Sequence, residues 1–263
     1  MHKNTGILRQ EILNLYDDSY SRVKHLKDKY KGETAYILAT GPSFASFEQD
    51  YLKDFFKDKL VLSIKQTYHT VEEEADFHLM NFCNVSDYEY KSPDTIAGWL
   101  IWDAYQPYQI INSGTRCDFI LDTYKLGNGA YDFDNSMPVK KELEKLSLDY
   151  HLARPWGGGI TCEIAIPLAM YLGCKKIVTV GWDLYGSTIN KYKNELEKIP
   201  IDHSWRQLKK GEEQMTVGKK EILTTIDFTE DLNRWMKEQD VVLQIVDPFN
   251  ENPAHESIER VSI

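Results

Sequence analysis

The sequence predicts an α/β fold built on a doubly wound, mainly parallel sheet, and two observations lead to this prediction. Short apolar runs that suit buried strands alternate along the chain with stretches of helical spacing, which is the pattern of a parallel sheet covered by helices. Glycine-containing turns follow two of the apolar runs, at Gly41 and Gly181. In open α/β sheets ligands bind beyond the carboxyl ends of the strands, where such turns expose backbone N–H groups. The two turns are therefore the first candidates for a site.

Length, charge and cysteine content narrow the class of protein. The 263 residues are enough for one large domain with its own core. The formal net charge of -10 counts against a broad nucleic-acid groove, which needs a basic face. No apolar run suits a signal peptide or approaches the roughly 20 residues that span a bilayer. The four cysteines are scattered, without a Cys-x-x-Cys pair, so we expect a cytoplasmic protein with reduced thiols.

The first half of the chain is predicted to begin with a helix and to continue into the sheet. Residues 5–31 carry apolar side chains at helical spacing and should form one amphipathic helix, so residues 1–33 are assigned to an N-terminal helical segment. The predicted strands are Ala35–Ala39, Lys59–Ile64 and Asp76–Met80, with a helix over Phe47–Phe56 between the first two.

The second half is less regular before residue 157 and regular after it. Residues 82–150 are rich in Asp, Asn and Tyr and are expected to form edge elements and loops. Thr161–Leu172 should form an apolar helix that Pro167 kinks and Gly173 ends. Strands are predicted at Lys176–Val180 and Val241–Val246, and a closing helix at Phe228–Lys237.

One polar stretch is too long for an ordinary connection between a strand and a helix. It covers about residues 186–220 and contains many Lys and Glu. Long insertions of this kind in α/β folds are often active-site lids. We therefore expect a single domain over residues 34–250 with a lid at 186–220, followed by a polar tail over 251–263.

Three motifs occur in order along the chain. They are Ala39-Thr40-Gly41-Pro42-Ser43, the helix start Gly157-Gly158-Gly159-Ile160, and Gly181-Trp182-Asp183-Leu184-Tyr185. This set resembles the sialyltransferases of glycosyltransferase family 42, whose first and third motifs are typically Gly-Asn-Gly-Pro-Ser and Gly-Ile-Asp-Phe-Tyr. It is similar also to their wider relatives, which include motility accessory factor glycosyltransferases and archaeal hydroxymethylpterin pyrophosphokinases. The resemblance covers roughly residues 35–250.

The resemblance implies a Rossmann-like domain, a GT-A-like variant with a lid, and a glycosyltransferase activity. The donor would be a nucleotide-activated sugar, with a CMP-linked acidic sugar as one candidate. The acceptor would be a glycan or another hydroxyl compound. A modified nucleic-acid base is a less favoured acceptor because the chain is acidic. No metal or other cofactor is expected, and a homo-oligomer is compatible with the resemblance.

Donor-binding residues follow from the same resemblance, position by position. Lys65 stands where the family usually has Asn, which changes the charge of the pocket. The residues assigned to the nucleotide or donor sugar are Thr40, Gly41, Pro42, Ser43, Lys65, Gln66, Asn81, Gly157, Gly158, Gly159, Gly181 and Asp183.

Catalytic roles are implied for residues of the lid. Tyr185 and Tyr192 match a tyrosine pair that hydrogen-bonds the departing phosphate, where phenol donors can stabilise developing charge without a metal. The family's general base is a His late in the lid, but residues 217–225 contain none. His203 is the nearest candidate, although a lone lid His is more often a surface residue. Asp202, His151 and Asp183 remain alternatives.

Two other functions stay open. The first is transfer of phosphates from ATP with Mg²⁺ held by carboxylates such as Asp183 or Asp132. The second is a nucleotide-binding protein that has lost its base. Asp132-Phe133-Asp134 lies in a turn-rich segment and reads as a turn rather than a metal site. Because the chain has no Gly-x-Ser-x-Gly elbow, Walker loop or Gly-x-Gly-x-x-Gly motif, hydrolase, kinase and dehydrogenase functions lack their minimal parts.

Overall fold

The structure is a computed structural model of the chain. It describes residues 5–81, 90–101, 116–124, 152–153, 160–184, 198–200 and 216–263.

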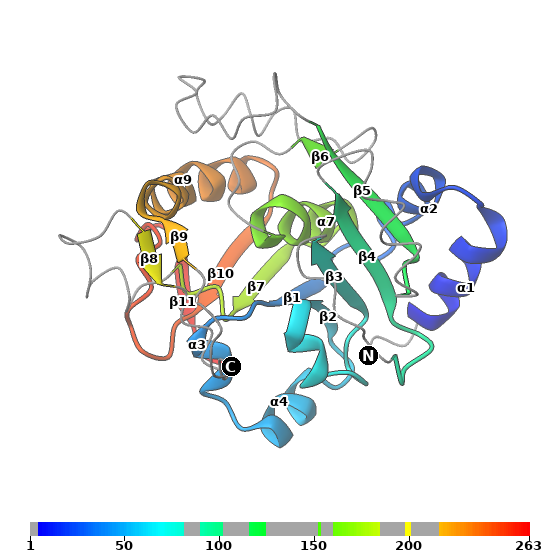
Figure 1. Ribbon diagram of the computed structural model, residues 1–263, viewed down its shortest axis with the longest axis horizontal. Coiled ribbons are helices and arrows are strands. Elements are labelled where there is room, and N and C mark those ends of the chain that lie inside the picture. The colour runs from blue at the N-terminus through cyan, green and yellow to red at the C-terminus, as the bar shows by residue number, and fades with distance from the viewer. Residues whose placement is uncertain are drawn as a thin grey trace.

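One parallel sheet organises the described part of the chain (Figure 1). Nine strands lie in the order β11-β10-β7-β1-β2-β3-β4-β5-β6, and every neighbouring pair is parallel. The predicted α/β, Rossmann-like fold is thereby confirmed. The strands are β1 Thr34–Leu38, β2 Leu60–Ile64, β3 Phe77–Asn81, β4 Ile96–Ile101, β5 Phe119–Tyr124, β6 Leu152–Ala153, β7 Lys176–Val180, β10 Val242–Val246 and β11 Glu259–Val261.

The strand order reverses between β1 and β7. Strands β2 to β6 follow β1 outward on one side, whereas β7, β10 and β11 extend the sheet on the other. The connections that leave β1 and β7 therefore diverge, and they leave a topological switch point at the carboxyl ends of these two strands. This is the place where open α/β sheets bind their ligands.

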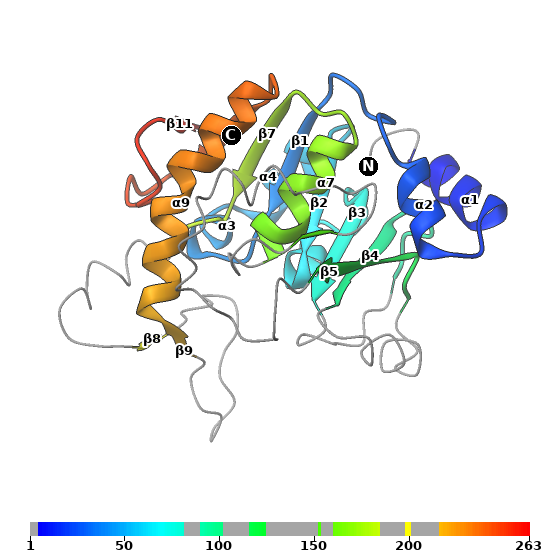
Figure 2. The same ribbon diagram turned by 90° about the horizontal axis from the view of Figure 1, so that it is seen from above.

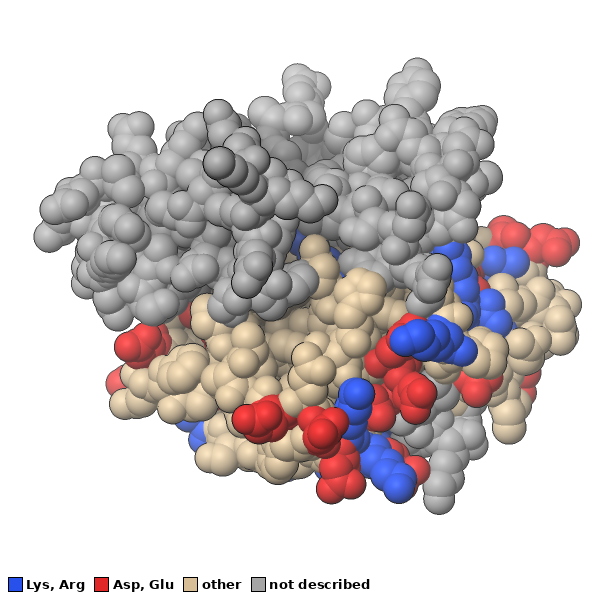
Figure 3. Space-filling model, turned by 60° about the horizontal axis from the view of Figure 1, so that its bottom comes forward, with Lys and Arg blue, Asp and Glu red and all other residues tan. Residues whose placement is uncertain are grey.

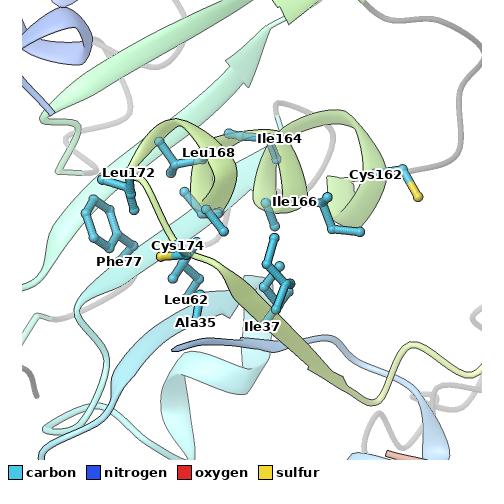
Figure 4. Close-up of a cluster of buried hydrophobic side chains, with 14 of the residues drawn as sticks. Ala35, Ile37, Leu62, Phe77, Cys162, Ile164, Ile166, Leu168, Leu172 and Cys174 are labelled. Atoms are coloured by element: carbon cyan, nitrogen blue, oxygen red, sulfur yellow. The ribbon is translucent and has the colours of Figure 1, made fainter. Parts of the chain in front are cut away.

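Helices cover both faces of the sheet (Figures 1 and 2). One apolar cluster joins the sheet to α1 Thr5–Leu15, α2 Ser19–His25, α7 Ile166–Tyr171 and α9 Lys219–Glu238. Figure 4 shows part of it, where Ile166, Leu168 and Leu172 lie over strand residues such as Ile37 and Leu62. A second cluster joins the other face to α3 Pro42–Ala45, α4 Gln49–Phe56 and the 3-10 helix η1 Lys65–His69. Both faces of the sheet are thus removed from water, which explains why β2 is buried along its whole length.

The single N-terminal helix predicted over residues 5–31 is wrong, because the segment forms α1 and α2 with a break between them. Asp18 starts the second helix by accepting a hydrogen bond from the Ser21 N–H at 2.8 Å. This bond, with others to the same carboxylate, lowers the pKa of Asp18. A capping carboxylate satisfies a donor that an interrupted helix would leave open, so the chain bends there at little cost.

Pro167 changes the local helix type instead of simply kinking it. Thr161–Ala165 form a π-helical turn, and Pro167 occupies the first turn of the α7 segment that follows. A proline cannot donate to the carbonyl four residues earlier, and its ring collides with that carbonyl in an α-helix. The wider π turn removes this conflict. Gly173 ends the helix with a φ of 88°, as the sequence predicts.

Three further predictions need correction. The region 82–150 was expected to hold edge elements, but β4 and β5 are inner parallel strands. The predicted tail over 251–263 adds β11 to the sheet next to β10. The closing helix α9 begins at Lys219, well before residue 228 and inside the predicted lid. Within that lid, β8 Lys198–Pro200 pairs antiparallel with β9 Thr216–Gly218; lid residues 186–197 and 201–215 lie outside the described part.

Candidate functional site

The strand register brings the predicted donor-binding residues to one edge of the sheet. Leu38 lies level with Ser63 of β2 and with Val180 of β7. Thr40 and Lys65 each stand two residues beyond their paired strand residues, so they leave the sheet at the same level. We use "carboxyl edge" for the residues that follow β1, β2, β3, β7 and β10 there.

A hydrogen-bonded pair joins the turns that follow β1 and β7. The buried Ser43 donates its backbone N–H to Oδ2 of Asp183 at 2.7 Å and its hydroxyl to Oδ1. The same hydroxyl oxygen accepts the N–H of Gly181 at 3.1 Å. The donors of Ser43, which the resemblance assigns to the nucleotide or donor sugar, are therefore engaged by a carboxylate of the protein itself. The ligand-binding roles of Ser43 and Asp183 stay predictions.

Burial raises the pKa of Asp183 above the usual carboxyl value, the hydrogen bonds from Ser43 oppose this, and the nearby charge of Asp247 adds to it. The carboxylate is only partly exposed. A carboxylate has about four acceptor positions, so the bonds from Ser43 leave Asp183 capacity for a further donor.

The glycines of the two turns allow the backbones to touch. A Cβ at Gly41 would collide with the Asp183 carboxylate and the Gly181 carbonyl, and a Cβ at Gly181 would collide with the Ala39 carbonyl. Gly41 donates its N–H to the Gly181 carbonyl at 2.8 Å. Gly181 also has a φ of 78°, which L side chains rarely adopt. Both glycines are thus needed for the contact between the turns. Pro42 begins α3, where no backbone donor is required.

Backbone strain is concentrated at the same edge. Six non-glycine residues among the described ones have a positive φ. Four are Asp or Asn, which tolerate this conformation. The other two are Lys65, with a φ of 52°, and Leu184, with a φ of 48°. Residues held in such sparsely populated conformations persist only where their surroundings fix them, and they cluster at functional sites.

The turn at Lys65 is fixed by residues that sequence reasoning did not assign to the site. The Thr67 hydroxyl lies 3.0 Å from the Leu38 carbonyl and accepts the Ile64 N–H at 3.0 Å, so it ties η1 to the end of β1. His78, which the sequence places in a core strand, lies with Nε2 at 2.7 Å from the Lys65 carbonyl oxygen. A histidine in a buried strand is the one sequence signal that could have found this contact.

The loop after β10 closes the other side of the switch point. Asn252 donates its side-chain N–H to the Trp182 carbonyl at 2.7 Å. Asp247 accepts the N–H groups of Glu251 and Asn252, each at 3.1 Å. Sequence reasoning assigned Asn252 to a polar tail and missed this contact, because nothing in the local pattern links it to Trp182.

The remaining predicted residues are only partly visible. Gln66 is the second residue of η1, and Asn81 is the last residue of β3. The other predicted site residues lie outside the described residues: Gly157, Gly158, Gly159, Tyr185, Tyr192 and His203.

In the part of the chain that the structure describes, no three His, Cys, Asp or Glu side chains gather closely enough to hold a metal ion. No described helix has the length and apolar character to cross a membrane.

The comparisons with known proteins include a distant structural likeness. No protein-family model matches the chain, and no curated protein matches it. Among solved structures, the MAf glycosyltransferase from Magnetospirillum magneticum AMB-1 is similar, with a TM-score of 0.47 and 10% sequence identity. The match covers 97% of this chain and 38% of that chain, so the chain spans well under half of that protein. At this degree of similarity neither activity nor substrate carries over.

Proposed function

We propose that the chain is a glycosyltransferase that takes a sugar from a nucleotide-activated donor and transfers it to a glycan or another hydroxyl acceptor. The observation that carries the proposal is the pair of glycine turns at the switch point between β1 and β7, joined by Ser43 and Asp183. It supports nucleotide binding, because ligands of open α/β sheets lie at this position. The transfer of a sugar rests on the motif resemblance.

The geometry suits a donor that binds over the joined turns. Asp183 is partly exposed and has acceptor capacity left after its bonds with Ser43. A ribose presents hydroxyl donors, so Asp183 is the group that we assign to the ribose. Ser43 then acts indirectly, because its two hydrogen bonds fix the position of the Asp183 carboxylate. Gly41 and Gly181 allow the two turns to pack directly against each other.

The proposed transfer step uses lid residues together with the joined turns. The acceptor oxygen forms a bond to the anomeric carbon of the sugar while the bond from that carbon to the phosphate oxygen breaks. Tyr185 and Tyr192 donate hydrogen bonds to the departing phosphate. His203 takes the acceptor proton, and Asp202, His151 and Asp183 are the alternatives for this role. We favour a glycan or small hydroxyl acceptor over a nucleic acid. The described residues on the face in Figure 3 mix acidic and basic groups and form no broad basic surface there.

Calorimetric titration of the protein with CMP, CDP, UDP and GDP tests the binding part of the proposal. At least one nucleotide should bind, and Gly41→Ala should abolish this binding because the added methyl separates the two turns. Gly32→Ala is the matched control, since a Cβ at that position meets nothing within 4 Å. Release of free nucleotide from the matching nucleotide-sugar, faster with an acceptor present, tests the transfer part. A protein that binds none of the four nucleotides, or that turns over only ATP, would contradict the proposal.

A further inference from the structure

A buried histidine forms a hydrogen bond with the backbone of the strained turn after β2. His78, fully buried in β3, lies with Nε2 at 2.7 Å from the Lys65 carbonyl oxygen and with Nδ1 at 2.9 Å from the Tyr90 hydroxyl. A carbonyl oxygen can only accept, so Nε2 carries the proton. Nδ1 is then the acceptor for the Tyr90 hydroxyl. Both ring nitrogens therefore have defined roles, and the ring has one orientation.

The surroundings of His78 keep this arrangement rigid. The imidazole stacks on Tyr68 with ring centroids 4.4 Å apart and an angle of 15°. Tyr90 lies under the Arg116 guanidinium, which is 4.9 Å from the ring centroid. Arg116 in turn donates to the carbonyls of Ser92 and Pro93. Burial lowers the pKa of His78 to about 3; the hydrogen bond with Lys65 opposes this and the positive charge of Arg116 adds to it, so the ring stays neutral near pH 7.

The residue that this arrangement fixes is a cation at the switch point. Lys65 leaves the sheet level with Thr40, which begins the turn after β1. Of the described residues in the two positions that follow β1, β2, β7 and β10, Lys65 is the one Lys or Arg. Asp183 and Asp247 lie on the same edge. The phosphate of a bound nucleotide would be repelled by these carboxylates, and a cation beside it would reduce the repulsion.

We infer that His78 is a positioning residue that sets Lys65 in its left-handed conformation to bind a phosphate group of the donor. The inference rests on the proposed function. It adds which part of the donor Lys65 binds and how the protein positions this residue. The carbonyl–imidazole bond fixes the peptide after Lys65, and this peptide determines where the side chain starts. The bond offsets part of the cost that a lysine has at a positive φ.

The alternative is that His78 only fills the core, and the two roles predict different measurements. A core residue affects the free energy of unfolding and leaves the affinity of the folded protein unchanged. A positioning residue changes the affinity, and it does so only as long as Lys65 is present to be positioned. A double-mutant cycle separates these cases.

The experiment measures the dissociation constant of the tightest of CMP, CDP, UDP and GDP, and of inorganic pyrophosphate, well below the unfolding temperature. Lys65→Met and His78→Phe should each weaken binding by roughly tenfold or more, as expected for loss of a hydrogen bond to a charged group. The double variant should bind no more weakly than Lys65→Met. His78→Gln should retain most of the affinity, because its amide N–H can replace Nε2–H.

Tyr30→Phe is the matched control. It removes a buried tyrosine hydroxyl that bonds Thr5, at the opposite end of the strands, and should lower stability while leaving the affinity as in the wild type. If His78→Phe does not fold, Tyr90→Phe takes its place, since it keeps the histidine and frees its ring. Tyr90→Phe should also weaken binding.

The outcomes distinguish this inference from the proposed function. A wild-type protein that binds no nucleotide contradicts both. Normal nucleotide binding by the wild type together with unchanged binding by Lys65→Met overturns the inference alone. Unchanged affinity of His78→Phe, or of Tyr90→Phe in its place, also overturns it. The inference is also overturned if the fold-loss of affinity in the double variant equals the product of the losses in the two single variants.

Discussion

Ser43 and Asp183 lie 140 positions apart in the sequence and are joined by a backbone N–H and a hydroxyl that both donate to one carboxylate. The pair adds to the Gly41–Gly181 hydrogen bond in joining the turns that follow β1 and β7. Asp183 is partly buried and accepts two hydrogen bonds, and a buried carboxylate is tolerated only when it is hydrogen-bonded in this way. The chemistry that we propose depends on these joined turns being rigid.

Ser43→Ala should lower the free energy of unfolding by about 1–3 kcal/mol, the usual cost of leaving buried polar groups unpaired. The variant removes a donor to Asp183 and the acceptor of the Gly181 N–H. Urea denaturation measures the change. Ser46→Ala is the control from the same turn, because the exposed Ser46 hydroxyl bonds only the Ser43 carbonyl in that turn. Equal losses in the two variants would show that the Ser43–Asp183 pair is not the stabilising contact.

Gly41→Ala should cost about 3 kcal/mol, the upper end of the range for overpacked sites, because the methyl group meets backbone and a fixed carboxylate. The φ of Gly41 is -78°, so the cost is steric and not conformational. Gly32→Ala tests the opposite case, with a φ of 83° and open space around the Cβ, and should cost about 1 kcal/mol. Thermal unfolding compares the two. A Gly41→Ala variant as stable as the wild type would mean that the turns can separate.

Acid should destabilise the protein through His78. Unfolded, this residue takes up a proton near its ordinary pKa of 6.5; folded, it does so only near 3. Between these values the unfolded state binds more protons, so the free energy of unfolding falls as the pH falls from 6.5, and above 6.5 this contribution is constant. The loss between pH 6.5 and pH 5 should be about 2 kcal/mol greater in the wild type than in His78→Phe. Denaturation of both proteins at the two pH values measures it, and parallel losses would contradict the burial of a neutral imidazole.

The lid residues have a kinetic prediction of their own. Phe in place of Tyr185 or Tyr192 should lower kcat by on the order of 100-fold while the affinity for the nucleotide hardly changes, since the phenols act on charge that develops during transfer. His203→Ala should abolish transfer to an acceptor more strongly than it slows hydrolysis of the donor, because water needs less help from a base. Steady-state assays of both reactions check this. Full transfer by His203→Ala would direct the search to Asp202, His151 or Asp183.

The parts of the fold that could be predicted are those whose local sequence decides their structure. β2 and β7 are apolar runs because parallel strands are buried on both faces. β11 was not predictable in this way, because the edge strand Glu259–Val261 is largely polar and gains its place only by pairing with β10. The break between α1 and α2 was visible in principle, since Asp18 followed by Ser19 is a helix start signal.

The candidate site likewise has features that the sequence predicts and features that it does not. The glycine turns could be found from sequence, because few residues other than glycine allow such close backbone contacts. The partners of those turns could not, because Asp183 meets Ser43, and Asn252 meets Trp182, across large separations that no periodicity encodes. His78 illustrates the same limit: its burial follows from its strand, whereas its bond with Lys65 depends on how β2 ends.

Hydrogen exchange read by mass spectrometry, with and without the tightest-binding nucleotide, tests the central claim most directly. The claim is that a nucleotide binds at the switch point between β1 and β7. Peptides that cover residues 34–47 and 176–184 should exchange more slowly when the nucleotide is present, and the α1 and α2 peptides should not change. Protection confined to other described segments, with these two peptides unaffected, would contradict the account.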